Sequence, residues 1–206
     1  MNRTELANEE PGAVDPTVAS ILDVTSDLLG RDGLENLQLR VVAKRARVSL
    51  STIYKHYPTR DALVIAAVER WMAQHVFEPL PAPESGEELG DGLIRVFRHV
   101  VAPWRDNPTM LAVLMQALLL PGGERLAAQG ESAVRAFEYY EGYDAEFARD
   151  VTTVLTYLAH GLLSLCASGR MDLDEMVRVY ERAVTRLTRD ARPEAAGSRV
   201  GRSRKS

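Results

Sequence analysis

Apolar residues recur at helical spacing along almost the whole chain, and no stretch alternates as a β-strand would. In the first part, this pattern predicts a helix over 16–29, which Asp15 can cap. Two short helices follow over about 39–46 and 49–56, and then a long helix runs over 60–77. The pattern therefore predicts an all-α protein.

A break at PLPAPESG, residues 79–86, separates these helices from a second group. The same periodicity predicts five further helices there, over about 89–104, 107–120, 124–140, 144–168 and 172–188.

Helix order and composition together suggest how the chain is organised. We expect a disordered arm over 1–14, a compact unit over 15–60, a helical domain over 61–189 and a disordered basic tail over 190–206. The helix over 60–77 connects the two folded parts.

Charge is unevenly distributed along these elements. The 206 residues carry a formal net charge of −4, yet the stretch from Gln38 to Arg60 has six Lys or Arg and no Asp or Glu. A compact basic patch on an acidic protein attracts a polyanion locally. The first three helices also follow the order of a helix-turn-helix, whose last helix enters the DNA major groove.

The turn 47–49 would bring the third helix across the second. Five residues are expected to face the core: Val41, Val42, Ala46, Val48 and Ile53. Four can face outward: Ser51, Thr52, Lys55 and His56. His56 also fits an ordinary surface histidine.

The stretch ARVSLSTIYKHYPTRDAL, residues 46–63, resembles the signature of the TetR family of bacterial transcriptional regulators. The motif resemblance covers about 16–76, and helix order extends it over the chain. NLQLRVVAKRA, at 36–46, and DNP, at 106–108, are similar to actinobacterial regulators of steroid and cholesterol breakdown. The resemblance implies a dimer that binds double-stranded DNA at a palindromic operator. The acidic N-terminal stretch has no apolar run that could serve as a secretory signal, so a cytoplasmic location is expected. The DNA-binding residues that the resemblance implies are Arg40, Lys44, Arg47, Ser49, Ser51, Thr52, Tyr54, Lys55, His56, Thr59 and Arg60.

Two residues depart from the family pattern. Arg47 stands where the turn usually has glycine, so a left-handed backbone there would cost ~1–2 kcal/mol, unless the turn relaxes or the cation meets phosphate. Leu50 stands where relatives often have a basic residue, and it can touch a thymine methyl group instead.

The last two predicted helices carry long apolar stripes. One recognition helix reads few base pairs, so a two-fold dimer is expected. The alternative is that the stripes pack only inside one monomer. The expected interface residues are Val151, Leu155, Leu158, Leu162, Leu165, Met176, Val177, Tyr180 and Val184.

The middle helices are rich in large apolar side chains with a few hydroxyl groups. Such a set suits an apolar pocket, and it equally suits a filled core. The resemblance implies a small apolar effector, such as a lipid, steroid or acyl-CoA. The candidate lining is Trp71, Phe97, Val101, Trp104, Leu111, Met115, Leu118, Phe137, Tyr140, Thr153 and Tyr157.

Other function classes find little support in the sequence. The chain contains none of the motifs GxSxG, GxGxxG and HExxH, and no Walker phosphate-binding loop. Its four histidines also lack the spacing of metal ligands. We therefore expect no enzyme activity, no cofactor and no metal. The longest apolar run, about 110–120, is too short to cross a membrane, so no membrane partner is expected. A helical protein-interaction module without ligand-responsive DNA binding is the alternative function.

Overall fold

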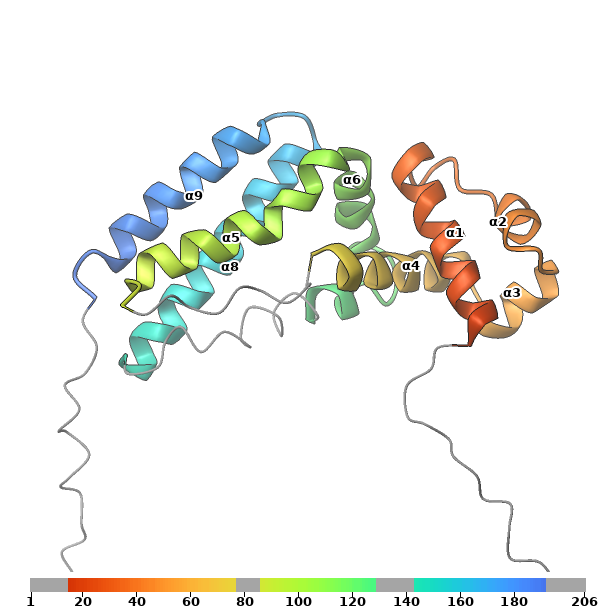
Figure 1. The fold of residues 1–206 in the computed structure, drawn as a ribbon, viewed down its shortest axis with the longest axis horizontal. Coiled ribbons are helices and arrows are strands. Elements are labelled where there is room, and N and C mark those ends of the chain that lie inside the picture. Colours follow the sequence, from red (N-terminus) through yellow and green to blue (C-terminus); the bar gives the residue numbers. More distant parts are fainter. Residues whose placement is uncertain (1–14, 77–85, 129–142, 192–206) are drawn as a thin grey trace, which may run out of the picture.

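The computed structural model describes residues 15–76, 86–128 and 143–191, and all regular structure within these ranges is helical (Figure 1). The helices are α1 (Pro16–Asp32), α2 (Leu39–Ala46), α3 (Leu50–His56), α4 (Arg60–His75), α5 (Leu89–Asp106), α6 (Pro108–Ala117), α8 (Ala145–Ala167) and α9 (Leu173–Thr188). Residues 124–128 are also helical. The expected all-α fold is confirmed.

Side-chain caps explain where most helices begin. Asp15 accepts a hydrogen bond from Thr17 N at 2.8 Å, and Thr59 Oγ1 accepts one from Ala62 N at 3.0 Å. Asp144 and Asp172 cap α8 and α9 in the same way. Each cap satisfies a backbone N–H that would otherwise lack a partner.

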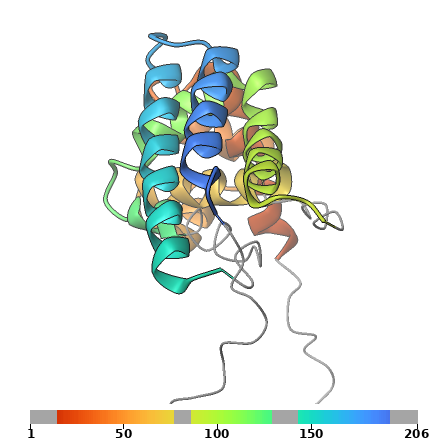
Figure 2. The same ribbon diagram turned by 90° about the vertical axis from the view of Figure 1, so that its left-hand side faces the viewer.

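Helices α1, α2 and α3 form one end of the molecule, and α4 runs from them toward the second group (Figure 1). α1 contacts α2, α4 and α6, while α9 contacts both α5 and α8. Seen from the opposite end, α5, α9 and α8 stand side by side (Figure 2). The end formed by α1, α2 and α3 and the end formed by α8 and α9 are therefore far apart in the fold.

A single hydrophobic core joins the two groups of helices. It extends from Ile21 in α1, through Val68 in α4 and Met110 in α6, to Val184 in α9. α1 and α6 pack together at Gly30, where a Cβ would make an ordinary contact with Met110 Cε at 3.7 Å. The break at residues 79–86 therefore does not divide the hydrophobic core, which is continuous between the two groups of helices.

Two details differ from the expectations, and a third cannot be compared over most of its length. Val41 is 37% exposed, because consecutive helical residues point about 100° apart and the buried face of α2 is Val42, Ala43 and Ala46. α6 ends at Ala117 rather than near residue 120. The chain folds back there so tightly that a Cβ on Gly123 would lie 2.4 Å from the Ala117 carbonyl oxygen. The expected helix over 124–140 lies mostly outside the described residues.

Candidate nucleic-acid interface

The turn between α2 and α3 sets the direction of the recognition helix. Arg47 adopts a left-handed conformation (φ 56°, ψ 39°), and Val48 N donates to the Ala43 carbonyl at 3.0 Å. Ser49 then caps α3 by accepting a hydrogen bond from Thr52 N at 3.0 Å. The chain keeps the tight turn at this point even though the residue is arginine and not glycine.

Helix α3 divides cleanly into an inner and an outer face. Ile53 is buried, and Tyr57, just beyond the helix, is half-buried. Burial raises the pKa of the Tyr57 hydroxyl, with a further contribution from Glu69, so the group stays neutral. Tyr54 is 49% exposed and Lys55 is also exposed. The outer face is therefore available to a partner.

Three hydroxyl groups gather at the start of α3. Ser49 Oγ lies 2.6 Å from Ser51 Oγ and 2.8 Å from Thr52 Oγ1. Ser49 and Ser51 are exposed, and Thr52 is half-buried. A hydroxyl both donates and accepts hydrogen bonds, so this group can meet either a base edge or a phosphate oxygen.

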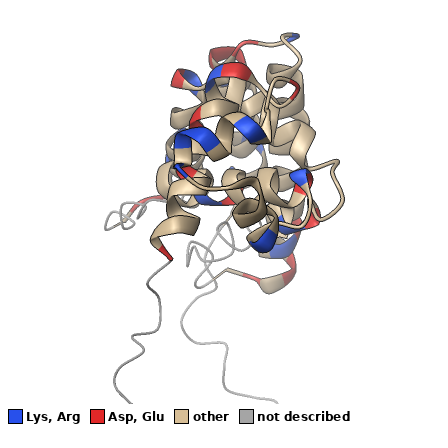
Figure 3. Cartoon of the chain, turned by 90° about the vertical axis from the view of Figure 1, so that its right-hand side faces the viewer, with Lys and Arg blue, Asp and Glu red and all other residues tan. Residues whose placement is uncertain are grey.

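Exposed cations surround this face. Arg40 and Lys44 project from α2, Arg47 lies in the turn and Lys55 is on α3. Figure 3 looks onto this end of the molecule and shows several basic segments there. Arg45 is exposed as well and was not among the expected contacts, although its place in the basic run was a signal for it.

Two expected contacts at the start of α4 already have partners. The Arg60 guanidinium donates a hydrogen bond to the Leu34 carbonyl, in the α1–α2 connection. The Thr59 hydroxyl caps the helix. His56 is half-buried at the end of α3. The Ser49 hydroxyl also caps a helix, so the exposed cations of α2, the turn and α3 are the freer candidates for contact with DNA.

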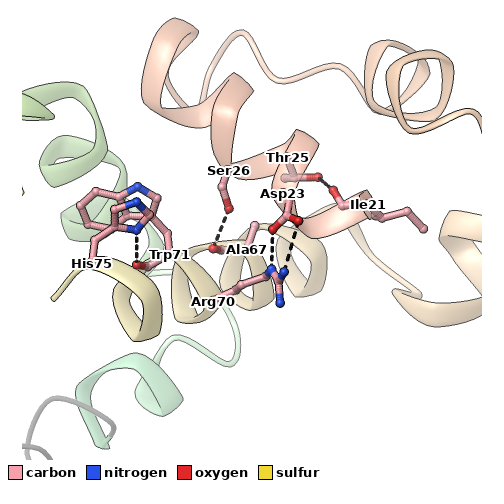
Figure 4. A network of polar contacts seen from close by, with 8 residues as sticks. All are labelled: Ile21, Asp23, Thr25, Ser26, Ala67, Arg70, Trp71 and His75. Atoms are coloured by element: carbon pink, nitrogen blue, oxygen red, sulfur yellow. Dashed lines mark hydrogen bonds and ion pairs between the residues drawn. The ribbon is translucent and has the colours of Figure 1, made fainter. Parts of the chain in front are cut away.

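Polar contacts fix α4 against α1 (Figure 4). Ser26 Oγ donates to the Ala67 carbonyl at 2.9 Å, and the Arg70 guanidinium pairs with the Asp23 carboxylate, with Nε 2.5 Å from Oδ1. Farther along α4, the Trp71 ring lies between two others, with the His75 ring and the Trp104 ring each 4.7 Å away between centroids. The polar contacts hold α4 against α1, and the Trp71–Trp104 contact holds α4 against α5 of the second domain.

The candidate effector residues fall into three groups. Trp71, Phe97, Val101, Trp104 and Leu111 are buried, and Met115 and Leu118 are half-buried beside them. Thr153 is exposed and Tyr157 is 72% exposed, so neither faces this interior. Phe137 and Tyr140 lie outside the described residues.

The candidate dimer residues also divide by burial. Six are buried inside the protomer itself: Val151, Leu155, Leu162, Met176, Tyr180 and Val184. The Tyr180 ring, for instance, stacks on Phe97 of α5 with centroids 3.5 Å apart. Leu158, Leu165 and Val177 are half-buried. The apolar groups that α8 leaves open are instead Val154, 49% exposed, and Tyr157, next to an uncovered Gly161.

Helix α8 is apolar on more than its inner face. It is the one described helix long and apolar enough to cross a membrane by length and composition, and only 17% of its most apolar window is buried. Contact with a second protein surface accounts equally well for such a face. Within the described ranges, no group of three His, Cys, Asp or Glu is placed to hold a metal ion.

Comparison with known families matches both halves of the chain. Residues 21–67 match "Bacterial regulatory proteins, tetR family", and residues 86–187 match "Tetracyclin repressor-like, C-terminal domain". The two matches follow each other along the chain in the order of the two groups of helices.

Two curated relatives are similar in sequence. The HTH-type transcriptional repressor KstR of Rhodococcus jostii is 40% identical over 50 residues, which are 24% of each chain. The HTH-type transcriptional repressor Rv1353c of Mycobacterium tuberculosis is 25% identical over 155 residues, 75% of this chain. The chain thus spans 24% and 58% of the lengths of these relatives.

Two solved structures share the fold. A TetR transcriptional regulator from Rhodococcus sp. RHA1 has a TM-score of 0.67 and 19% identity, over 84% of this chain and 95% of that one. The multidrug binding protein EbrR, in complex with malachite green, has a TM-score of 0.60 and 24% identity, over 84% and 98% of the two chains.

Proposed function

Because the chain belongs to the TetR family of bacterial transcriptional regulators, we propose that it is a repressor that binds a palindromic operator as a homodimer. A small apolar effector releases it from that operator. The observation that carries the proposal is the outer face of α3, where Ser51, Tyr54 and Lys55 are exposed and the exposed charges on α2, the turn and α3 are all basic.

Each part of this face has a distinct task. Arg40, Lys44 and Arg47 supply charge to phosphates regardless of sequence, while Ser51 and Thr52 are placed to meet base edges at the start of α3. The 38–60 stretch contains no carboxylate that would repel the duplex. Relatives named as repressors, KstR and Rv1353c, support repression as the outcome of binding.

A second copy supplies the other half of the operator contact. Val154, Tyr157 and Gly161 form an open strip on α8, and burying it against its symmetry mate removes apolar surface from water. We propose this strip, flanked by the half-buried Leu158, Leu165 and Val177, as the centre of the dimer contact.

The effector site belongs among the interior side chains of the second domain. Trp71 at the end of α4 contacts Trp104 of α5, so a ligand seated beside this pair can displace the helix that holds the DNA reader. EbrR, which has the same fold, was solved in complex with malachite green, and this supports a small-molecule ligand in the second domain. The ligand must prefer the arrangement that cannot bind DNA, because equal affinity for both would shift nothing.

A gel shift on the DNA upstream of the chain's own gene tests the operator. We expect a saturable complex that needs an intact palindrome and weakens steeply with salt. A duplex with one half-site scrambled is the control. Equal binding to the intact and scrambled duplexes would contradict the proposal.

The effector can be found through the two tryptophans, since the chain has only Trp71 and Trp104 and they adjoin each other. A screen of apolar compounds should identify one that changes tryptophan fluorescence, raises the melting temperature and dissolves the operator complex. A compound that binds but leaves the operator complex intact would not be the effector.

A further inference from the structure

The solvent-facing side of α9 forms a shallow groove of about 360 Å³ with unusual chemistry. Its lining is Arg178, Glu181, Arg182, Thr185, Arg186 and Arg189. Four of these six residues are arginines, all four are exposed, and no apolar residue takes part.

Neighbouring acids offset the positive charge of this arginine groove only in part. None of the four arginines forms an ion pair within the described part of the chain. Glu181, the one acid in the lining, is held by Arg98 of α5 at 2.6 Å. The main partner of Asp174 is Arg105, at 2.7 Å. Both Arg105 and, to a smaller extent, Arg178 lower the pKa of the Asp174 carboxylate. The arginine groove is therefore a local cation on a chain with a net charge of −4.

The form of the groove indicates the class of ligand. Residues 178 and 189 lie about 16 Å apart along a helix, too far for one phosphate to reach both. A repeated anion fits this row better. Protein interfaces and membrane-binding helices need apolar anchors, and the arginine groove offers none. A nucleic-acid backbone needs only cations.

The sequence beyond α9 continues the same character. Residues 192–206 contain five Lys or Arg and one acidic residue, Glu194. This excess of basic residues increases the attraction to a polyanion.

We propose that the arginine groove binds the backbone of a second stretch of duplex DNA without sequence preference. It lies at the opposite end of the molecule from α2 and α3 (Figures 1 and 2), so it cannot share the half-site that α3 reads. A repressor seated on its operator then also holds another segment of DNA. This goes beyond operator binding and does not depend on it.

The test uses the full chain, a fluorescent operator duplex and a non-operator duplex fixed to beads. The wild-type protein should retain the operator duplex on the beads. The double variant Arg182→Glu with Arg186→Glu should lose this retention while binding the operator in solution as before. Its affinity for free non-operator duplex should fall about ten-fold, and the salt slope should shrink by about 2.

A second double variant, Arg149→Glu with Arg170→Glu, makes the same change in charge at exposed sites outside the arginine groove and should behave as wild type. Equal losses in both variants, or no loss in either, would overturn the proposal. So would a changed oligomeric state in the first variant alone, measured by light scattering, because the arginine groove would then lie between copies. Failure of the operator proposal would instead remove the preference for the palindrome and the retention on beads, while the loss of affinity for free non-operator duplex in the first variant would remain.

Discussion

Arg47 holds a left-handed backbone that glycine would adopt without strain, and it is the one described non-glycine residue with positive φ. Arg47→Gly should relieve ~1–2 kcal/mol of backbone strain. Glycine also gives the unfolded chain more conformational entropy, which costs ~0.5–1 kcal/mol. The variant should therefore raise the free energy of unfolding by up to about 1 kcal/mol. Urea unfolding measures this change. Operator affinity should fall, because a phosphate-facing cation is lost.

The variant Arg47→Asn separates the two effects, since asparagine tolerates the left-handed region but carries no charge. It should bind DNA as weakly as Arg47→Gly. Operator affinity equal to wild type in both variants would show that this arginine meets no phosphate.

Lys44 and Thr52 should differ in what their loss changes. Lys44→Ala should weaken binding to every duplex and reduce the salt slope by about 1, because it removes a phosphate contact. Thr52→Ala should leave the salt slope unchanged and alter base preference by about 1–3 kcal/mol at one position of each half-site. Anisotropy titrations against a set of single-base operator variants distinguish the two results. Identical profiles for both variants would argue against α3 in the groove.

At the level of elements, α1 and α4 are joined by one buried and one exposed polar contact. Ser26→Ala removes the buried hydrogen bond to the Ala67 carbonyl and should lower the free energy of unfolding by about 1 kcal/mol. Asp23→Ala removes an ion pair whose carboxylate is 51% exposed, which is worth less because solvent screens it. Urea denaturation of both variants tests the order, and a larger loss in Asp23→Ala would contradict it.

Most helix boundaries could be predicted because they depend on neighbours in the sequence. Asp15, Thr59, Asp144 and Asp172 each cap a helix through residues two or three positions later. The outward face of α3 followed only in part from periodicity, since Ser51 and Lys55 are exposed but Thr52 and His56 are half-buried. The α1–α4 contacts could not be predicted, because Ser26 and Ala67 are 41 positions apart and no local pattern pairs them.

The faces of α8 and α9 show a second limit of sequence reasoning. Both helices have apolar residues around much of their circumference, so periodicity could not tell an intramolecular contact from an intermolecular one. Only the packing places Met176 and Tyr180 against the protomer's own interior and leaves Tyr157 outside. Ion pairs across helices are equally hidden from local patterns: Arg98 and Arg105 of α5 pair with α9, and Arg95 pairs with Glu87.

For the whole molecule, the open strip on α8 should determine the oligomeric state. Tyr157 is 72% exposed, so Tyr157→Asp should leave the fold of the protomer intact. It should nevertheless dissociate the dimer, because a buried carboxylate without a partner is costly. Sedimentation velocity should show a monomer. Operator affinity should drop, since two linked readers no longer bind together.

Leu119→Asp is the matched control, because Leu119 is 87% exposed but lies after α6. It should remain a dimer. A dimeric Tyr157→Asp protein would place the contact on another surface.

The unbroken core limits how this protein can be re-engineered. Replacing residues 15–60 with a foreign DNA-binding domain would remove α1, which packs against α4 and α6. Val64, Val68 and Met110 of the core would then lose the α1 side chains that cover them, and the chimera should aggregate. A change of operator specificity is better made by substituting the exposed positions of α3, where no buried neighbour has to be matched. The regulator would keep its own fold and bind a different operator sequence.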